Sequence, residues 1–414
     1  MKVWPLTVRG TGAVLLGIAF FFLAHALHLT ELLYVSILLF VVVGASLASL
    51  YLVRRTASIA RAFRPDVAPA GGDTHVRVQV DIRAPLPSAQ ATWNDHLAPG
   101  LVGDARGEFP AVGSGLGTGP QRVELGYVVH AERRGIRPIG PLSVTSTDPF
   151  GFARRRHIIG TPVPLTVTPA VIELGALDDL PGSVGGSLHS ETNELGQGAD
   201  NLIPRAYVPG DSMRRIHWRA SAHRDDLMVR QEEQESTPEA TVVFDRTADR
   251  YGHGALLTPG ADPAFEAAVS ACASAVARLT DEGYVVTVMD VDGTALVERI
   301  DSEDHSAVED MTIAFASITA RREGTLEDLK NLLLGAMTGP LVVVTGRFEE
   351  VDAEMLAPLV HHSTLPVLLT VDPTDRALAD IATAGWRAAQ IDVAGDLSDA
   401  WIAAIDRESD HVIA

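Results

Sequence analysis

Two long apolar stretches occupy the N-terminal region. Residues 10–30 and 32–53 carry no formal charge, and only Glu31 separates them. Each stretch is close to the roughly 20 residues that a helix needs to cross about 30 Å of hydrocarbon. A cleaved signal peptide is the alternative, but the first stretch is too long for one and a second follows at once. The pattern therefore predicts a hairpin of two transmembrane helices within residues 1–64.

Basic residues flank this hairpin at both ends and are absent from its turn, residues 28–31. The basic flanks consist of Lys2, Arg9, Arg54, Arg55, Arg61 and Arg64. Cytoplasmic segments beside membrane helices are enriched in Lys and Arg. We therefore expect a multi-pass protein of the cell membrane, with the N-terminus and the C-terminal soluble domains in the cytoplasm.

Residues 65–175 show the polar–apolar alternation of half-buried strands. Residues 75–82 alternate strictly, and further strands are predicted at 121–130, 142–147 and 165–168. Segments rich in Gly and Pro, at 113–120 and 135–141, are expected as turns. Short strands at this spacing predict a small, sandwich-like antiparallel β domain. A linker rich in Gly and Ser follows at 176–204.

The pattern changes to alternating strands and helices in the last domain, residues 205–414. Near-continuous apolar strands are expected at 241–244, 284–291, 341–344, 365–371 and 389–393. Helical periodicity is found at 265–280, 355–361, 376–384 and 397–405. This alternation predicts an α/β domain of the Rossmann type, with a parallel sheet covered on both faces. Ligands of such sheets bind outside the carboxyl ends of the strands, which directs attention to Asp245.

The chain carries a strongly negative net charge. It has 53 acidic and 33 basic residues in 414, for a net charge of −20. Residues 1–64 hold six of the basic residues and one acidic residue, so the remainder carries 27 basic and 52 acidic residues, a charge of −25. An acidic body argues against nucleic acid as a partner and is repelled by anionic lipid. The single cysteine, Cys272, excludes an internal disulfide.

A cationic segment interrupts this acidic body. Between Arg205 and Arg230 there are six Arg and two His against three Asp. Pro209, Gly210 and Asp211 predict a turn, 213–222 a short helix and 227–229 a strand. These arginines either pair with neighbouring carboxylates, with Trp218 packed under the helix, or form a docking surface. No hydrolase motif is present, and an enzyme would need His217 with Asp211, or Asp245 with a metal.

This segment resembles the signature of a bacterial family, the domain-of-unknown-function family fifty-eight. The matching positions are Arg205, Tyr207, Pro209, Gly210, Asp211, Arg215, Ile216, His217, Trp218, residues 220–222, Leu227, Val229 and the acidic residues 232–235. Residues 134–141 and 147–151 resemble the segments that precede the family's signature, and the hairpin is similar too. The resemblance implies a von Willebrand factor A-like domain and partnership in an operon with AAA+ ATPases of the MoxR type. It implies no enzymatic activity.

Such A-like domains can bind Mg²⁺ through an Asp-x-Ser-x-Ser loop after the first strand. Here Asp245 matches the first position, Thr247 keeps a hydroxyl, and Asp249 replaces the second Ser. Oxygen ligands of this kind suit a hard cation. A later strand ends at Thr345-Gly346-Arg347, where the family usually has an Asp before the Gly, and Arg246 and Arg347 add positive charge. The expected state is therefore without a cofactor, and Mg²⁺ remains the alternative.

The favoured interpretation is a membrane-anchored scaffold without catalytic activity, which docks a MoxR-type ATPase in the assembly or maturation of a protein complex. The docking residues are expected among the signature positions together with Arg214 and Arg219. Metal-dependent adhesion through Asp245 and an unrecognised hydrolase are the alternatives.

Overall fold

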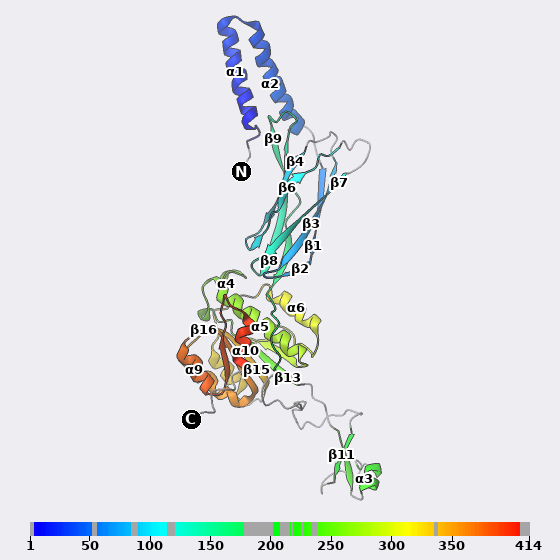
Figure 1. Ribbon diagram of the computed structural model, residues 1–414, viewed down its shortest axis with the longest axis vertical. Coiled ribbons are helices and arrows are strands. Elements are labelled where there is room, and N and C mark those ends of the chain that lie inside the picture. The colour runs from blue at the N-terminus through cyan, green and yellow to red at the C-terminus, as the bar shows by residue number, and fades with distance from the viewer. Residues whose placement is uncertain are drawn as a thin grey trace. The chain divides into compact units, whose positions relative to one another are not determined.

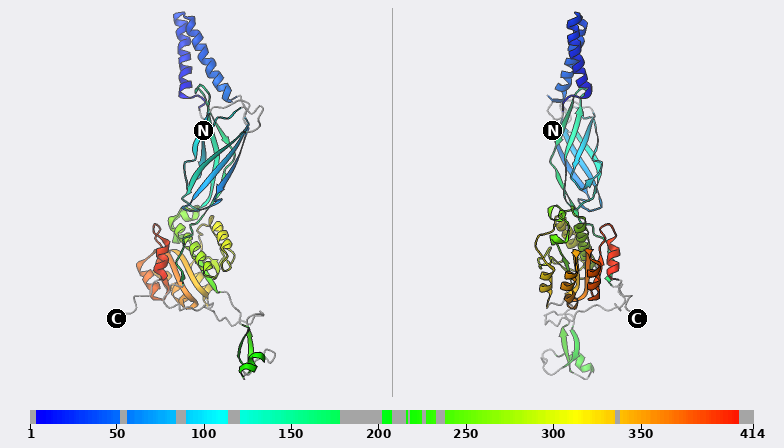
Figure 2. Two further views of the ribbon diagram at one scale, coloured as in Figure 1. Left: turned by 45° about the vertical axis from the view of Figure 1, so that its right-hand side comes forward. Right: turned by 90° about the vertical axis from the view of Figure 1, so that its left-hand side faces the viewer.

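The computed structural model describes residues 4–51, 56–83, 90–113, 121–177, 202–207, 216, 218–224, 227–232, 238–334 and 338–405. These residues group into two compact units. The first comprises residues 1–171, 251–270 and 310–321, and the second comprises 172–250, 271–309 and 322–414. The first unit contains the apolar helices and antiparallel sheets, and the second contains a parallel sheet (Figures 1 and 2).

The first unit begins with two apolar helices, α1 (Val8–Leu27) and α2 (Thr30–Tyr51). They lie side by side in Figures 1 and 2, and both are long and apolar enough to cross a membrane, with mean hydropathies of 1.9 and 2.4. Their buried residues are mostly small, so the two backbones approach closely. The Ser36 hydroxyl, for example, donates to the Gly17 carbonyl at 2.8 Å. The predicted helices are thus confirmed, each starting about two residues early.

Two sheets follow and share one apolar core. Because alternate side chains of strands such as β3 point inward, Val76, Val78 and Val80 are buried between the sheets. The first sheet has the order β1 (Thr56–Arg64), β3 (Asp73–Arg83), β7 (Gln121–Ala131) and β5 (Leu101–Val102). The second has the order β2 (Val67–Pro69), β10 (Val163–Thr168), β8 (Gly135–Thr147), β4 (Ala91–Leu97) and β6 (Arg106–Phe109), and β9 (Arg154–Ile159) pairs with β8.

Two sequence expectations are corrected in this unit. Residues 56–64, assigned to the basic flank of the hairpin, form strand β1, and Arg61 is buried in an ion pair with Asp95 at 2.9 Å. Residues 135–141, expected as a turn, belong to β8. Gly135 and Gly140 adopt positive φ values of 128° and 106° within this strand. Other residues avoid these values, so both positions favour glycine.

The first unit also includes α4 (Gly254–Leu257), the first half of α5 (Pro263–Asp281) and the end of α6 (His305–Phe315). Arg134, at the start of β8, is fully buried among them. Its guanidinium binds both carboxylate oxygens of Glu266, at 2.7 and 2.8 Å, and donates to the carbonyls of Phe315 and Ile318. It also lies over the Phe265 ring. The Arg134-Gly135-Ile136 run therefore has a structural role.

The second unit is built on five parallel strands. Their order is β14 (Val285–Met289), β13 (Glu239–Phe244), β15 (Thr338–Phe348), β16 (Ser363–Pro373) and β17 (Arg387–Gln390). One face packs against α7 (Leu326–Leu333), α8 (Glu350–Leu356), η4 (Ala357–His362) and α9 (Asp375–Thr383), and α10 (Leu397–Ile405) contacts β16 and β17. The predicted parallel sheet is confirmed.

The signature region of the second unit forms a separate two-stranded sheet. β11 (Leu202–Ala206) pairs antiparallel with β12 (Met228–Glu232), and the short helix α3 (Trp218–Arg224) lies between them in the chain. Ile216 forms a bridge with Val229. The Ser221 hydroxyl accepts from the Met228 amide at 2.8 Å, which ties α3 to β12.

Candidate functional site

The carboxyl edge of the parallel sheet places Asp245 at a topological switch point. The chain leaves β13 for β14 on one side and then crosses to β15 on the other, so loops diverge above β13 and β15. Asp245 follows β13 directly, and Thr345 lies on the neighbouring β15. Ligands of open parallel sheets bind at such points, so this is the first place to examine for chemistry.

Both oxygens of the Asp245 carboxylate are already engaged. Oδ1 accepts from the Thr247 amide at 2.9 Å, and Oδ2 accepts from the Thr345 hydroxyl at 2.9 Å. The Arg250 guanidinium lies 3.6 Å from Oδ2. The carboxylate is only 1% exposed, so the protein itself supplies the groups that replace water around it.

Arg250 is the central cation of this edge. It comes from η3 (Ala248–Arg250), and its guanidinium also binds Asp352 in the first turn of α8, at 2.7 Å between Nη2 and Oδ1. A second pair lies nearby, where Arg246 binds the fully buried Asp290 at 2.9 Å. The loop after β13 therefore supplies Arg250 to Asp245, which directly follows that strand, and Arg246 to Asp290, which follows β14.

The pKa values of these groups follow from burial and pairing. Burial raises the pKa of Asp245, and the hydrogen bonds from Thr247 and Thr345 and the charge of Arg250 only partly offset this. For Arg250, burial lowers the pKa, but the hydrogen bonds and charge of Asp352, together with the charge of Asp245, more than compensate, so its pKa is raised. The guanidinium thus remains a cation inside the edge.

The arrangement meets the requirements of an open divalent-metal site only in part. A bound Mg²⁺ needs carboxylate and hydroxyl oxygens with free lone pairs. The Thr247 hydroxyl is buried with no recorded hydrogen-bond partner among the described residues, whereas Arg250 occupies the charged side of Asp245. Asp249, the third predicted ligand, is exposed on η3. Within the described ranges, no group of three or more His, Cys, Asp or Glu side chains is suitably placed to bind a metal ion. Metal binding by Asp245, Thr247 and Asp249 stays an untested prediction.

The structure also places Arg347, at the carboxyl edge of the parallel sheet. Arg347, suspected of adding charge near Asp245, is half exposed and lies 3.9 Å from Asp372 instead. Sequence reasoning missed Arg250 as the partner of Asp245, and Asp352 as the second carboxylate that Arg250 binds. The available signal was an Arg five positions after the strand-ending Asp, but its direction depends on the 3-10 turn that carries it.

Several of the predicted docking residues lie outside the described residues. These are Pro209, Gly210, Asp211, Arg214, Arg215 and His217. The backbones of Arg205 and Arg219 are placed, on β11 and α3. Tyr207 follows β11, and its amide donates to the Leu227 carbonyl at 2.8 Å. The docking role itself stays a prediction.

Trp218 is not packed as the structural interpretation of the segment required, which placed it under the short helix. It begins α3 and is 69% exposed, whereas Ile216, Met228 and Val229 are buried. The tryptophan therefore does not lie under its helix. Trp93, Trp386 and Trp401 are buried, and among the described residues the other exposed tryptophan is Trp4, at 64%.

The comparisons agree with the family resemblance. Residues 204–381 match the family model described as "Protein of unknown function DUF58", and this match supports assignment to that family. The matched region runs from β11 to α9. None of the curated proteins matches the chain. A solved structure titled "X-ray structure of Northeast Structural Genomics Consortium target SoR45" is 14% identical over 30% of this chain and 92% of that chain, with a TM-score of 0.14. A similarity of that size carries no argument.

Proposed function

We propose that the protein is a membrane-anchored scaffold that docks a partner protein through its signature segment. The observation that carries the proposal is Trp218, exposed on α3 within the matched family region. Tryptophan and arginine are enriched among the few residues that dominate protein–protein binding energy. Six arginines between Arg205 and Arg230 accompany it in the sequence.

The segment is suited to presenting such a surface. β11, α3 and β12 are held together by the strand pairing, the Ile216–Val229 bridge and the Ser221–Met228 hydrogen bond. With Ile216, Met228 and Val229 directed inward, Trp218 and Leu227 (45% exposed) remain outside. These contacts hold the backbone that carries Trp218 and Leu227, so less backbone entropy would be lost on binding.

The two apolar helices support the membrane anchor. A helical hairpin satisfies its own backbone hydrogen bonds in lipid, and the outward side chains of α1 and α2 include exposed Leu, Ile and Phe. The basic residues that flank the hairpin support a cytoplasmic position for both of its ends. The A-like identity of the parallel-sheet domain and the MoxR-type ATPase as partner come from the family resemblance, and both belong to this proposal.

The test is capture of the MoxR-type ATPase of the same operon by the full chain solubilised in mild detergent. Trp218→Ala is expected to weaken binding at least about tenfold, the effect of losing a central aromatic anchor. Charge reversal of Arg214, Arg215 and Arg219 is expected to abolish it. Trp4→Ala, which removes an equally exposed tryptophan outside the signature segment, is the matched control and should bind normally.

The outcomes separate the parts of the proposal. Unchanged capture by both the Trp218 and the arginine variants would remove the signature segment as the docking surface. Failure of the unmodified chain to capture the ATPase would remove that partner. Turnover of a small molecule by the purified chain, lost on changing His217 or Asp245, would favour an enzyme instead.

A further inference from the structure

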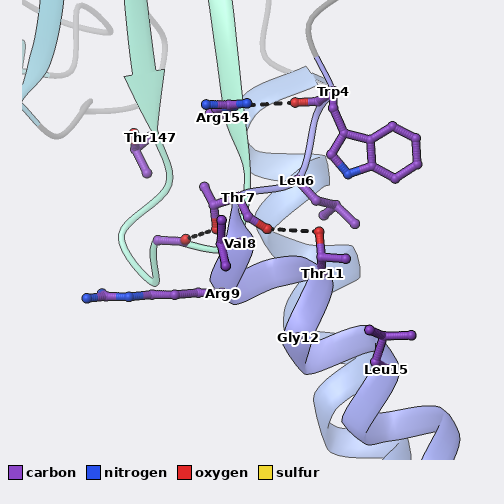
Figure 3. Close-up of a pocket in the computed structure, with 11 residues that line it drawn as sticks. Trp4, Leu6, Thr7, Val8, Arg9, Thr11, Gly12, Leu15, Thr147 and Arg154 are labelled. Carbon is purple, nitrogen blue, oxygen red and sulfur yellow. Dashed lines mark hydrogen bonds between the residues drawn. The ribbon is translucent and has the colours of Figure 1, made fainter.

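We infer a binding site for an anionic phospholipid in the groove where α1 meets the turn between β8 and β9. This inference rests on the proposed membrane anchor. The groove has a volume of about 820 Å³ and is lined by α1 and its preceding residues on one side and by residues 147–154 on the other (Figure 3). Its polar groups include Arg9 and Arg154, and its apolar groups include Trp4 and Leu15.

The β8–β9 turn is fixed against the start of α1 by its own sequence. Asp148, almost fully buried, accepts hydrogen bonds from the amides of Phe150 and Ala153 and so shapes the turn. The turn then accepts the Thr7 amide at the Phe152 carbonyl, at 2.9 Å, and the Thr7 hydroxyl at Gly151. The Asp148-Pro149-Phe150-Gly151 run, which the docking proposal does not use, thus builds one wall of the groove.

The approach of the turn to α1 depends on Gly10. A Cβ at this position would lie 2.0 Å from the Phe152 carbonyl oxygen, so no larger residue fits without moving the backbone. The Arg154 amide also donates to the Pro5 carbonyl, at 2.8 Å. The groove therefore has defined walls and is not a gap between independent parts.

Among the described residues, the cations of the groove have no recorded acidic partner, and Arg154 Nε donates to the Trp4 carbonyl at 3.4 Å (Figure 3). In the described part of this acidic chain, no ion pair is recorded for Arg9 or Arg154, nor for the adjacent Arg155 and Arg156 of β9. The Arg155 guanidinium instead donates to the Leu50 carbonyl at the end of α2 and lies over the Tyr51 ring. By contrast, buried arginines elsewhere, such as Arg61 and Arg134, are paired with carboxylates.

Arg9 is also placed where its own helix disfavours a cation. It lies in the first turn of α1, at the positive end of the helix dipole, and that turn contains no acidic residue. An external anion would be attracted by both the dipole and the guanidinium. The Thr7 hydroxyl already accepts from the Gly10 amide at 3.1 Å, so a phosphate group would be held by the two arginines, and among the described residues no carboxylate lines the groove.

The apolar side of the groove favours a lipid over a free phosphate. Gly12 and Leu15 line it on α1, and a Cβ at Gly12 would meet no atom within 4 Å, so α1 leaves space beside Gly12. If α1 enters the bilayer, an acyl chain lies along Gly12 and Leu15 while its phosphate lies at Arg9 and Arg154. Trp4 and Tyr51, exposed near the same helix ends, are residue types enriched at the membrane interface.

The test uses the full chain in lipid nanodiscs and brominated lipids that quench tryptophan. Brominated phosphatidylglycerol and brominated phosphatidylcholine are compared, and Trp4→Phe identifies the part of the quenching that comes from Trp4. The expected result is preferential quenching by the anionic lipid. Replacing Arg9 or Arg154 by Gln should reduce the preference roughly fivefold each, the effect of removing one cation near an anionic bilayer.

Two matched controls separate a built site from general surface charge. Arg156→Gln removes a cation two residues along β9 that does not line the groove, and it should preserve most of the preference. Gly12→Leu should abolish it by filling the groove, whereas Gly44→Leu, at a position on α2 that is equally open, should not. An Arg156 effect as large as that of Arg154, or equal quenching by both lipids, would overturn the site.

A third arm distinguishes the sources of phosphate. Inorganic phosphate at millimolar concentration should leave the lipid preference unchanged, and its full competition would replace the lipid assignment by a general anion site. If the chain washes off membranes in alkaline carbonate, the anchor itself fails. If it stays in the membrane but shows no lipid preference, only the lipid site fails.

Discussion

Two arginines pair with three buried aspartates at the carboxyl edge of the parallel sheet. Asp245 and Asp352 share Arg250, and Asp290 pairs with Arg246. In an open metal site a divalent ion would supply this positive charge. Here Arg250 and Arg246 supply positive charge, and their ion pairs position the loop after β13 and the start of α8.

The raised pKa of Asp245 predicts a specific pH dependence of stability. Between the ordinary pKa of an aspartate and the raised value, the folded state binds more protons than the unfolded state, so the free energy of unfolding falls as pH rises. Asp245→Asn cannot titrate and lacks this fall. We expect the stability of the native chain relative to the variant to decrease as the pH rises from about 4, the ordinary range of an aspartate, towards the raised pKa of Asp245.

Thermal denaturation of both full chains in detergent, across this pH range, measures the difference. Because the reading is a slope with pH, any constant effect of replacing the carboxylate by an amide cancels. Asp352→Asn is the contrasting variant. It removes the hydrogen bonds that hold Arg250, so we expect it to be less stable than the native chain at neutral pH. A parallel pH profile for Asp245→Asn and the native chain would contradict the argument.

At the scale of elements, the hydrophobic pattern predicted the strands and helices whose sequence periodicity agrees with their burial. The strands of the parallel sheet and helices α5, α9 and α10 were predicted within a few residues, because long apolar runs and helical periodicity leave little ambiguity. Strand β1 was missed because its arginines resemble a membrane flank. Only the fold shows that Arg61 meets Asp95, with Gly140 beside it, where a Cβ would lie 2.7 Å from the guanidinium.

The contacts of Arg134 with Glu266, Phe315 and Ile318, here called the Arg134 clamp, give a prediction at the scale of elements. Arg134→Ala leaves Glu266 without its partner and leaves the carbonyls of Phe315 and Ile318 without a donor. Breaking a buried pair in this way costs about 3 kcal/mol. Arg134→Lys should recover only a minor part, because an ammonium cannot bind a carboxylate and two carbonyls in the geometry of a guanidinium. The melting temperature of the full chain in detergent measures both.

Arg133→Ala is the control for this clamp. Arg133 is exposed beside Arg134, so its loss should change stability by no more than about 0.5 kcal/mol. Equal stability of the Arg134→Ala and Arg133→Ala chains would show that the buried pair contributes little. Full rescue by Lys would show that charge alone, without the fork geometry, holds the clamp.

At the scale of the whole molecule, the distribution of charged residues along the sequence differs from their distribution in the folded structure. The sequence assigned the basic flank to residues 1–64 and an acidic body to the rest. Strand pairing brings Arg154 and Arg155 from that body to the ends of α1 and α2. Sequence reasoning could therefore predict the hairpin and the position of Asp245 at the end of a strand, because both depend on local pattern. It could not predict the positions of Arg250 and Arg154, because these depend on turns and strand register.

The orientation of the hairpin is the last prediction, and the chain is well suited to testing it. Its single cysteine, Cys272, is fully buried, and burial raises the pKa of the thiol, so it should not react with a maleimide in the folded protein. Cysteines introduced at Leu29, exposed in the turn between α1 and α2, and at Asp104, exposed in the β domain, then report on opposite sides of the membrane. In intact cells a membrane-impermeant maleimide should label Leu29→Cys, and it should label Asp104→Cys only after permeabilisation, because the basic flanks predict that both helix ends lie in the cytoplasm. Labelling of Asp104→Cys from outside would reverse the orientation, and it would also place the signature segment where no cytoplasmic ATPase can reach it.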